Sequence, residues 1–167
     1  MEAWAKQTRG FTIVELLIVI VVIAILAAIT LVAYNGIANR ANSNTVQADL
    51  SNFAKKIELY KVDNNQYPQA TSAGLSTLGM KITTASYDVA NYNFYYCTPT
   101  DRSEYAIAAR SKAGETFYVS SSGRGSLGNV LPSWTVSCGT IGYSVLSDIA
   151  FCYIYNKGTG AWSSWAQ

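Results

Sequence analysis

The sequence contains no histidine, and charged residues make up only 13% of its 167 residues. Without imidazole groups, a His-based catalytic triad and a His-ligated metal site are both excluded. The 12 Lys and Arg exceed the 10 Asp and Glu by two, and a net charge of +2 does not support nucleic-acid binding by bulk electrostatics. Asp101 and Glu104 are close in sequence, but a turn with two solvated acids explains them better than a catalytic pair. We therefore expect no enzymatic activity, no metal and no cofactor.

Long apolar runs are also missing, with one exception near the N-terminus. Residues 16–33 contain a single polar residue, Thr30, and the run extends back to Phe11. About 20 apolar residues are enough for a helix to cross the hydrocarbon core of a bilayer. Lys6 and Arg9 precede the run, so the positive-inside rule predicts a cytoplasmic N-terminus and residues 35–167 outside.

Three interpretations of this run compete: a cleaved secretory signal, a plain single-pass anchor, and a span that serves in assembly. Secretory signals have shorter apolar cores, of about 7–15 residues, although Ala27-Ala28 leaves that interpretation open. A plain anchor does not explain Glu15, because an acidic residue in a span is costly and usually functional. One alternative is that Glu15 reaches the lipid headgroups from the helix start, where an acid is favourable.

The stretch "RGFTIVELL", residues 9–17, resembles the processing motif of type IV prepilins. In that family a basic leader ends in glycine, a membrane peptidase cleaves after it, and the new N-terminal residue is N-methylated. A glutamate follows as the fifth mature residue. This chain has every element of the motif: Lys6, Arg9, Gly10, Phe11 and Glu15.

The resemblance implies a leader over residues 1–10, cleavage after Gly10, N-methylation of Phe11, and a transmembrane and assembly helix over residues 11–34. It also implies a partner for Glu15: the Phe11 ammonium of a neighbouring subunit, which exists only after cleavage. In a low dielectric that pair is favoured over an isolated carboxylate, so the charge would set the axial register between helices. Gly10 lacks a Cβ and can enter a narrow protease cleft.

The following segment, residues 39–69, shows helical periodicity up to a stop at Asn64-Asn65 and Pro68. We expect a nearly continuous helix over residues 11–63, roughly 80 Å long. Its second half carries one apolar stripe, which we expect to pack on a globular domain. The stripe consists of Val46, Leu50, Phe53, Ile57 and Tyr60.

Runs rich in Tyr, Phe, Ile and Val predict strands over residues 91–98, 104–111 and 116–123, joined by short turns as an antiparallel meander. Residues 123–129 are glycine-rich and are interpreted as a flexible loop. Residues 130–167 predict further short strands, with a hairpin around residues 157–160. The fold class is therefore α+β: a long N-terminal helix packed on a C-terminal antiparallel β-sheet, similar to pilins. The expected globular head spans residues 35–167 and includes the C-terminal half of the long helix.

Three cysteines, Cys97, Cys138 and Cys152, lie in the part expected to be exported, where one disulfide is favoured. Pilins often close a C-terminal loop in this way, and the resemblance favours Cys138–Cys152, a loop of about 15 residues worth about 3 kcal/mol. Cys97 would then be a buried thiol. Pairing of Cys97 with either of the others stays open.

These observations predict the structural subunit of a type IV pilus filament, used in adhesion, motility or DNA uptake. The resemblance implies a homo-oligomeric filament, a prepilin peptidase and an inner-membrane assembly platform as partners. It places the chain in the cytoplasmic membrane before assembly and in an extracellular filament afterwards. The alternatives are a minor pilin, a competence or secretion pseudopilin, or a single-pass anchored binding domain.

Overall fold

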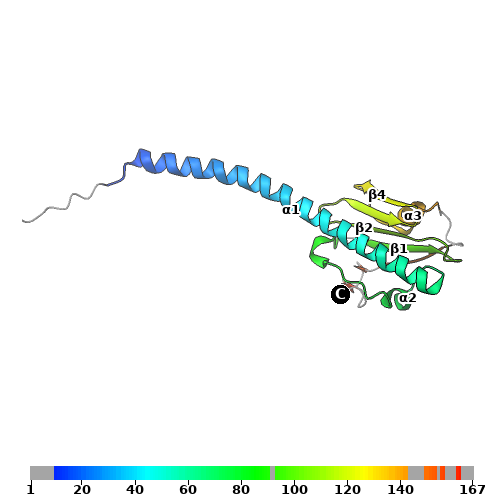
Figure 1. Ribbon diagram of the computed structural model, residues 1–167. Coiled ribbons are helices and arrows are strands. Elements are labelled where there is room, and N and C mark those ends of the chain that lie inside the picture. The colour runs from blue at the N-terminus through cyan, green and yellow to red at the C-terminus, as the bar shows by residue number, and fades with distance from the viewer. Residues whose placement is uncertain (1–9, 91–92, 143–148, 154, 157–160, 163–167) are drawn as a thin grey trace, which may run out of the picture. The chain divides into compact units, whose positions relative to one another are not determined.

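The computed structural model describes residues 10–90, 93–142, 149–153, 155–156 and 161–162. The chain divides into two units, residues 1–38 and residues 39–167. The longest element is α1, Ile13–Asn64, a continuous helix of 52 residues (Figure 1). It agrees with the predicted span of 11–63 to within two residues. The helix ends where Asn65 takes a left-handed conformation, φ 59°, which asparagine tolerates better than most residues.

The apolar stripe on the second half of α1 is confirmed. Val46, Leu50, Phe53 and Ile57 are completely buried or nearly so, and Tyr60 is half-buried. The four buried residues join one core with side chains from the sheet, where the rings of Phe53 and Phe94 meet edge to face at 5.3 Å. Burial of each large apolar side chain contributes about 1.5–3 kcal/mol, so this stripe fixes the second half of the helix to the sheet.

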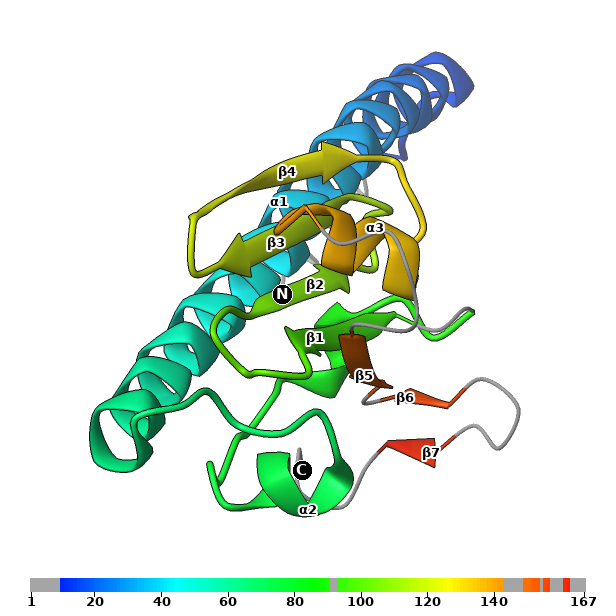
Figure 2. The ribbon, with the colours of Figure 1, turned by 90° about the vertical axis from the view of Figure 1, so that its right-hand side faces the viewer.

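The sheet has five antiparallel strands in the order β4-β3-β2-β1-β5 (Figure 2). Their bounds are Phe94–Pro99 for β1, Ala106–Arg110 for β2, Thr116–Ser120 for β3, Gly123–Gly128 for β4 and Ile149–Tyr153 for β5. The predicted meander over β1, β2 and β3 is confirmed. The short strands β6, Tyr155–Asn156, and β7, Ala161–Trp162, also pair as the predicted hairpin, although its turn lies outside the described residues.

The interpretation of residues 123–129 as a flexible loop is wrong, because β4 pairs with β3 over most of this stretch. Its glycines give no strand signal, since β propensity reflects side-chain packing. The packing comes from the neighbouring strand instead: a Cβ at Gly125 would lie only 3.0 Å from the Tyr118 ring. The aromatic side chain therefore covers the glycine across the two strands, as aromatic residues do for glycines in edge strands.

The two faces of the sheet are covered by different helices. Alternate residues of β1 and β2, such as Tyr96 and Ile107, join the core with α1, whereas Cys97 and Ala106 belong to a second, smaller core. The helix α3, Trp134–Gly139, packs on this second face against β1 and β2 (Figure 2). Two short elements precede the sheet: the helix α2, Ser72–Ser76, and the 3₁₀ turn η1, Thr84–Ser86.

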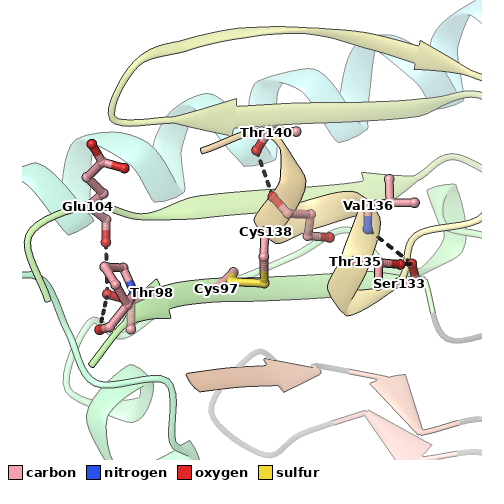
Figure 3. Close-up of a disulfide and its surroundings, with 10 residues drawn as sticks. Cys97, Thr98, Glu104, Ser133, Thr135, Val136, Cys138 and Thr140 are labelled. Atoms are coloured by element: carbon pink, nitrogen blue, oxygen red, sulfur yellow. Dashed lines mark hydrogen bonds between the residues drawn. A yellow bond between two sulfur atoms is a disulfide. The ribbon is translucent and has the colours of Figure 1, made fainter. Parts of the chain in front are cut away.

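The disulfide joins Cys97 on β1 to Cys138 on α3, so the predicted Cys138–Cys152 bridge is wrong, and so is the expectation that Cys97 is a free thiol (Figure 3). The reason is the unforeseen helix α3, which places Cys138 over β1 with a Cα–Cα distance of 5.5 Å. Ser133 starts this helix, because its Oγ accepts a hydrogen bond from the Val136 amide at 3.2 Å. Cys152 lies on β5, where its backbone pairs with Tyr96.

Loss of this bridge should destabilise the head. With Cys97 and Cys138 separated by 41 positions in the sequence, the loop-entropy model gives about 4 kcal/mol. We expect Cys138→Ser to lower the free energy of unfolding by about this amount, and Cys152→Ser, the matched control, to leave the bridge and its contribution in place. Denaturant titration measures the difference. Non-reducing peptide mapping provides the direct check, and a Cys152 peptide linked to either of the others would contradict the assignment.

Candidate assembly and processing site

The predicted cleavage position lies just before α1, outside regular secondary structure. Gly10 and Phe11 are both exposed, and the Phe11 side chain is 89% accessible to solvent. A Cβ built on Gly10 would meet no atom within 4 Å. The described fold therefore does not require glycine at this position. A requirement for glycine here would have to come from a partner that binds the segment from outside.

Thr12 and Glu15 form a capping box at the start of α1. The Thr12 amide and the Thr12 hydroxyl both donate to Glu15 Oε2, at 2.8 Å and 2.7 Å, and the Glu15 amide donates to Thr12 Oγ1 at 3.2 Å. Such reciprocal bonds satisfy backbone donors that a helix start otherwise leaves unpaired. This role was not predicted from the sequence, although the spacing Thr-x-x-Glu is its signal.

The capping box occupies only one oxygen of the Glu15 carboxylate. Both hydrogen bonds from Thr12 go to Oε2, and within the described residues Oε1 accepts none. The carboxylate is thus oriented by its own helix while one oxygen stays available to a further donor. This geometry is compatible with the predicted partner, an ammonium group supplied by another subunit. Within one chain, no hydrogen bond or ion pair joins Phe11 to Glu15 in the described residues.

The rest of the segment presents apolar side chains to all sides. The large apolar residues from Ile13 to Ile37 are between 47% and 85% exposed, and no residue in the most apolar 18-residue window of α1 is buried. By length and composition this helix could cross a membrane. Its polar residue Thr30 needs no outside partner, because its hydroxyl donates to the Leu26 carbonyl at 2.8 Å. A helix that is apolar all round requires lipid or other helices around it.

Removal of the Thr12 hydroxyl should loosen the first turn of α1. An N-cap oxygen contributes about 1 kcal/mol, so in detergent Thr12→Val should raise amide hydrogen exchange at Glu15 by about fivefold. Thr12→Ser keeps the oxygen and should exchange at the wild-type rate. Equal exchange in the valine variant and the wild type would contradict the role of the cap.

No group of three or more Cys, His, Asp or Glu side chains in the described residues could hold a metal ion. Asp101, considered above as a possible acid, is exposed in the turn after β1. Its carboxylate accepts hydrogen bonds from the Ser103 hydroxyl and amide, at 2.7 Å and 3.0 Å, which hold the pKa of Asp101 below its usual value. These contacts are typical of an acidic residue in a solvent-exposed turn.

Comparison with known proteins supports the interpretation of both regions. The prokaryotic N-terminal methylation motif matches residues 5–31, and the model of the type II secretion system protein G matches residues 34–129. The type IV wide pilus major component PilA4 of Thermus thermophilus is 35% identical over 120 residues, which cover 72% of this chain and 86% of that protein. The chain belongs to the family of type IV pilins and type II secretion pseudopilins. This membership confirms the predicted resemblance and the prediction of a pilin-type subunit.

Relatives from the secretion branch match over a shorter length. The type II secretion system core protein G of Escherichia coli is 36% identical over 93 residues, which cover 56% of this chain and 62% of that protein. The corresponding protein of Dickeya chrysanthemi is 33% identical over 79 residues, covering 47% and 51%. The chain thus spans about half to three fifths of these secretion proteins and most of the Thermus pilin.

Proposed function

We propose that this chain is the structural subunit of a type IV pilus filament. It is made as a precursor in the cytoplasmic membrane, with its N-terminus inside, cleaved after Gly10 by a prepilin peptidase and N-methylated at Phe11. An inner-membrane platform then assembles it into an extracellular homopolymer. The observation that carries the proposal is the exposed apolar helix with an oriented Glu15 at its start, directly after an accessible Gly10-Phe11 bond.

The physical basis of assembly follows from the surroundings of this helix. Inside a bilayer, apolar side chains gain nothing from the hydrophobic effect when they leave lipid for protein, so association depends on close packing and polar contacts. The free Oε1 of Glu15 supplies such a contact. Cleavage creates the Phe11 ammonium, and each incoming subunit can then neutralise the charge of a neighbour. The processed subunit, unlike the precursor, carries both members of the pair.

Filament imaging tests the proposal. Cells that make the protein should carry surface filaments, cells that lack it should not, and the protein in sheared filaments should begin at methylated Phe11 by mass spectrometry. Retention of Met1 in the membrane-bound protein would favour the single-pass anchored binding domain instead.

A second candidate is a pseudopilin or minor pilin, favoured by the protein G model over residues 34–129. It would also begin at Phe11, so the N-terminus does not distinguish it. Unchanged filaments together with a secretion defect in the deletion strain would identify the pseudopilin. Unchanged filament composition with few copies per filament would identify the minor pilin.

A further inference from the structure

Exposed apolar side chains of the described head gather in two places. Five large hydrophobic residues beyond residue 38 are exposed, and four of them form two pairs, whereas Val89 stands apart. The pairs are Leu59 with Val62, and Val130 with Leu131. Contiguous exposed apolar surface on a soluble domain usually marks an interaction site, while a single exposed residue needs no explanation.

The first pair lines a groove between α1 and the β3–β4 edge of the sheet. Leu59 and Val62 are 64% and 80% exposed, and Ala54 and Val119 lie along the same groove, which has a volume of about 600 Å³. Lys55, Glu58 and Arg124 supply its charges. We call this surface the α1 groove.

The second pair, called here the 130–131 patch, lies at the opposite end of β3. The Val130 carbonyl accepts a hydrogen bond from the hydroxyl of Thr116, the first residue of β3, whereas Val119 of the α1 groove is close to its last residue. Asn129 fixes the start of the patch, because its Oδ1 accepts a hydrogen bond from Arg110 at 2.7 Å. Val130 and Leu131 are 43% and 47% exposed.

We infer that the α1 groove of one copy binds the 130–131 patch of the next copy. The inference rests on the proposed function, in which the neighbours of each head are copies of this chain. The groove and the patch lie near opposite ends of β3 in one hydrogen-bonded sheet, so they do not meet within a single molecule. Between copies they form a heterologous contact, and a heterologous contact that does not close into a ring continues as a helical filament.

Charge supports the same pairing. The α1 groove carries Lys55, Arg124 and Glu58, and the turn that leads into Thr116 beside the patch carries Glu115 and Lys112. Each surface therefore carries positively and negatively charged side chains. Each of them can face a side chain of opposite charge on the other surface. Such an arrangement selects the register of a contact more than its strength.

Cross-linking between cysteines tests the contact in filaments. Val62→Cys and Leu131→Cys together, treated in sheared filaments with a short bismaleimide, should give a ladder of dimers, trimers and higher oligomers. Each single variant should give no more cross-linked product than wild-type filaments, which contain the native Cys152. Val62→Cys combined with Val89→Cys is the matched control and should give no ladder.

Filaments of the double variant without a ladder would overturn the inference and leave the proposed function intact. More dimer from either single variant than from wild-type filaments would also overturn it, because the introduced cysteine would then lie next to its own counterpart or to Cys152 of a neighbouring copy. Absence of filaments from wild-type cells would refute the proposed function and the inference together.

A charge introduced into the patch provides a second measurement if the cysteine variants fail to assemble. Leu131→Lys should weaken the contact by about tenfold or more, which corresponds to about 1.4 kcal/mol. The yield of sheared filaments should fall accordingly, with the membrane-bound amount unchanged. Val89→Lys should not lower it. Equal yields from the two variants would overturn the inference.

Discussion

Glu15→Gln subunits should accumulate in the membrane and form few or no filaments. The substitution keeps the size and polarity of the side chain and removes its charge. The Phe11 ammonium of the neighbouring subunit would then be left without a counter-ion in a low dielectric, which costs several kcal/mol per contact. This penalty recurs with every subunit added, so long filaments should be lost. The protein in a sheared fraction, compared with the membrane fraction, measures the effect.

Because glutamine can replace glutamate in the capping box, Glu15→Gln tests the charge of the side chain separately from its role as a helix cap. Glutamine serves as well as glutamate at the third position of a capping box, so the start of α1 should stay folded in the Gln variant. Thr12→Val is the matched control, since it removes the cap oxygen and keeps the carboxylate. Wild-type filament yield from Glu15→Gln would show that Glu15 has no pairing role and acts only as a helix cap or by reaching the headgroups.

Gly10→Leu should block maturation completely. We expect a bulky side chain before the scissile bond to prevent entry into the peptidase, and the uncleaved precursor has no Phe11 ammonium to offer its neighbours. Gly10→Ala should block maturation as well, although its smaller side chain makes it the milder variant. Mass spectrometry of the protein from cells should find the chain beginning at Met1, with no filaments.

The fold itself should not change in this variant, because a Cβ at Gly10 meets no atom within 4 Å. Gly36 offers a matched control: it is also a glycine with no atom near its missing Cβ, but it lies within α1. Gly36→Ala should be processed normally. A Gly10→Leu protein that still begins at Phe11 would refute the assigned cleavage position.

The parts of the fold that the sequence predicted are those whose signal repeats locally. The stripe from Val46 to Ile57 has helical spacing and four buried residues, and the helix stop at Asn64-Asn65 is a backbone preference of asparagine itself. The strands β1 and β3 are rich in aromatic and β-branched residues, whereas β2 has only Ile107 among alanines and Arg110. Each of these signals depends on neighbours within one element, so no knowledge of the tertiary structure is needed.

The predictions that were wrong, for β4 and for the disulfide, concern features that depend on contacts between residues far apart in the sequence. β4 has glycines where a strand usually carries large side chains, and its packing comes from Tyr118 on the next strand. The Cys97–Cys138 bridge depends on where α3 lies on the sheet, whereas the resemblance to pilins favoured the shorter Cys138–Cys152 loop. The processing and assembly residues were predicted from their motif. The Thr12–Glu15 cap is an exception among the failures, because it is local and its signal, Thr-x-x-Glu, is visible in the sequence.

If the protein is exposed outside the cell, as proposed above, the covalent loop closed by Cys97 and Cys138 bears on its resistance to proteolysis. It contains β2, β3 and the exposed, glycine-rich β4. A single peptide-bond cut anywhere inside the loop leaves two fragments that are still tied together through sulfur. The nicked subunit therefore remains a single covalently linked molecule, and a filament of such subunits would keep its continuity after a cut in this loop.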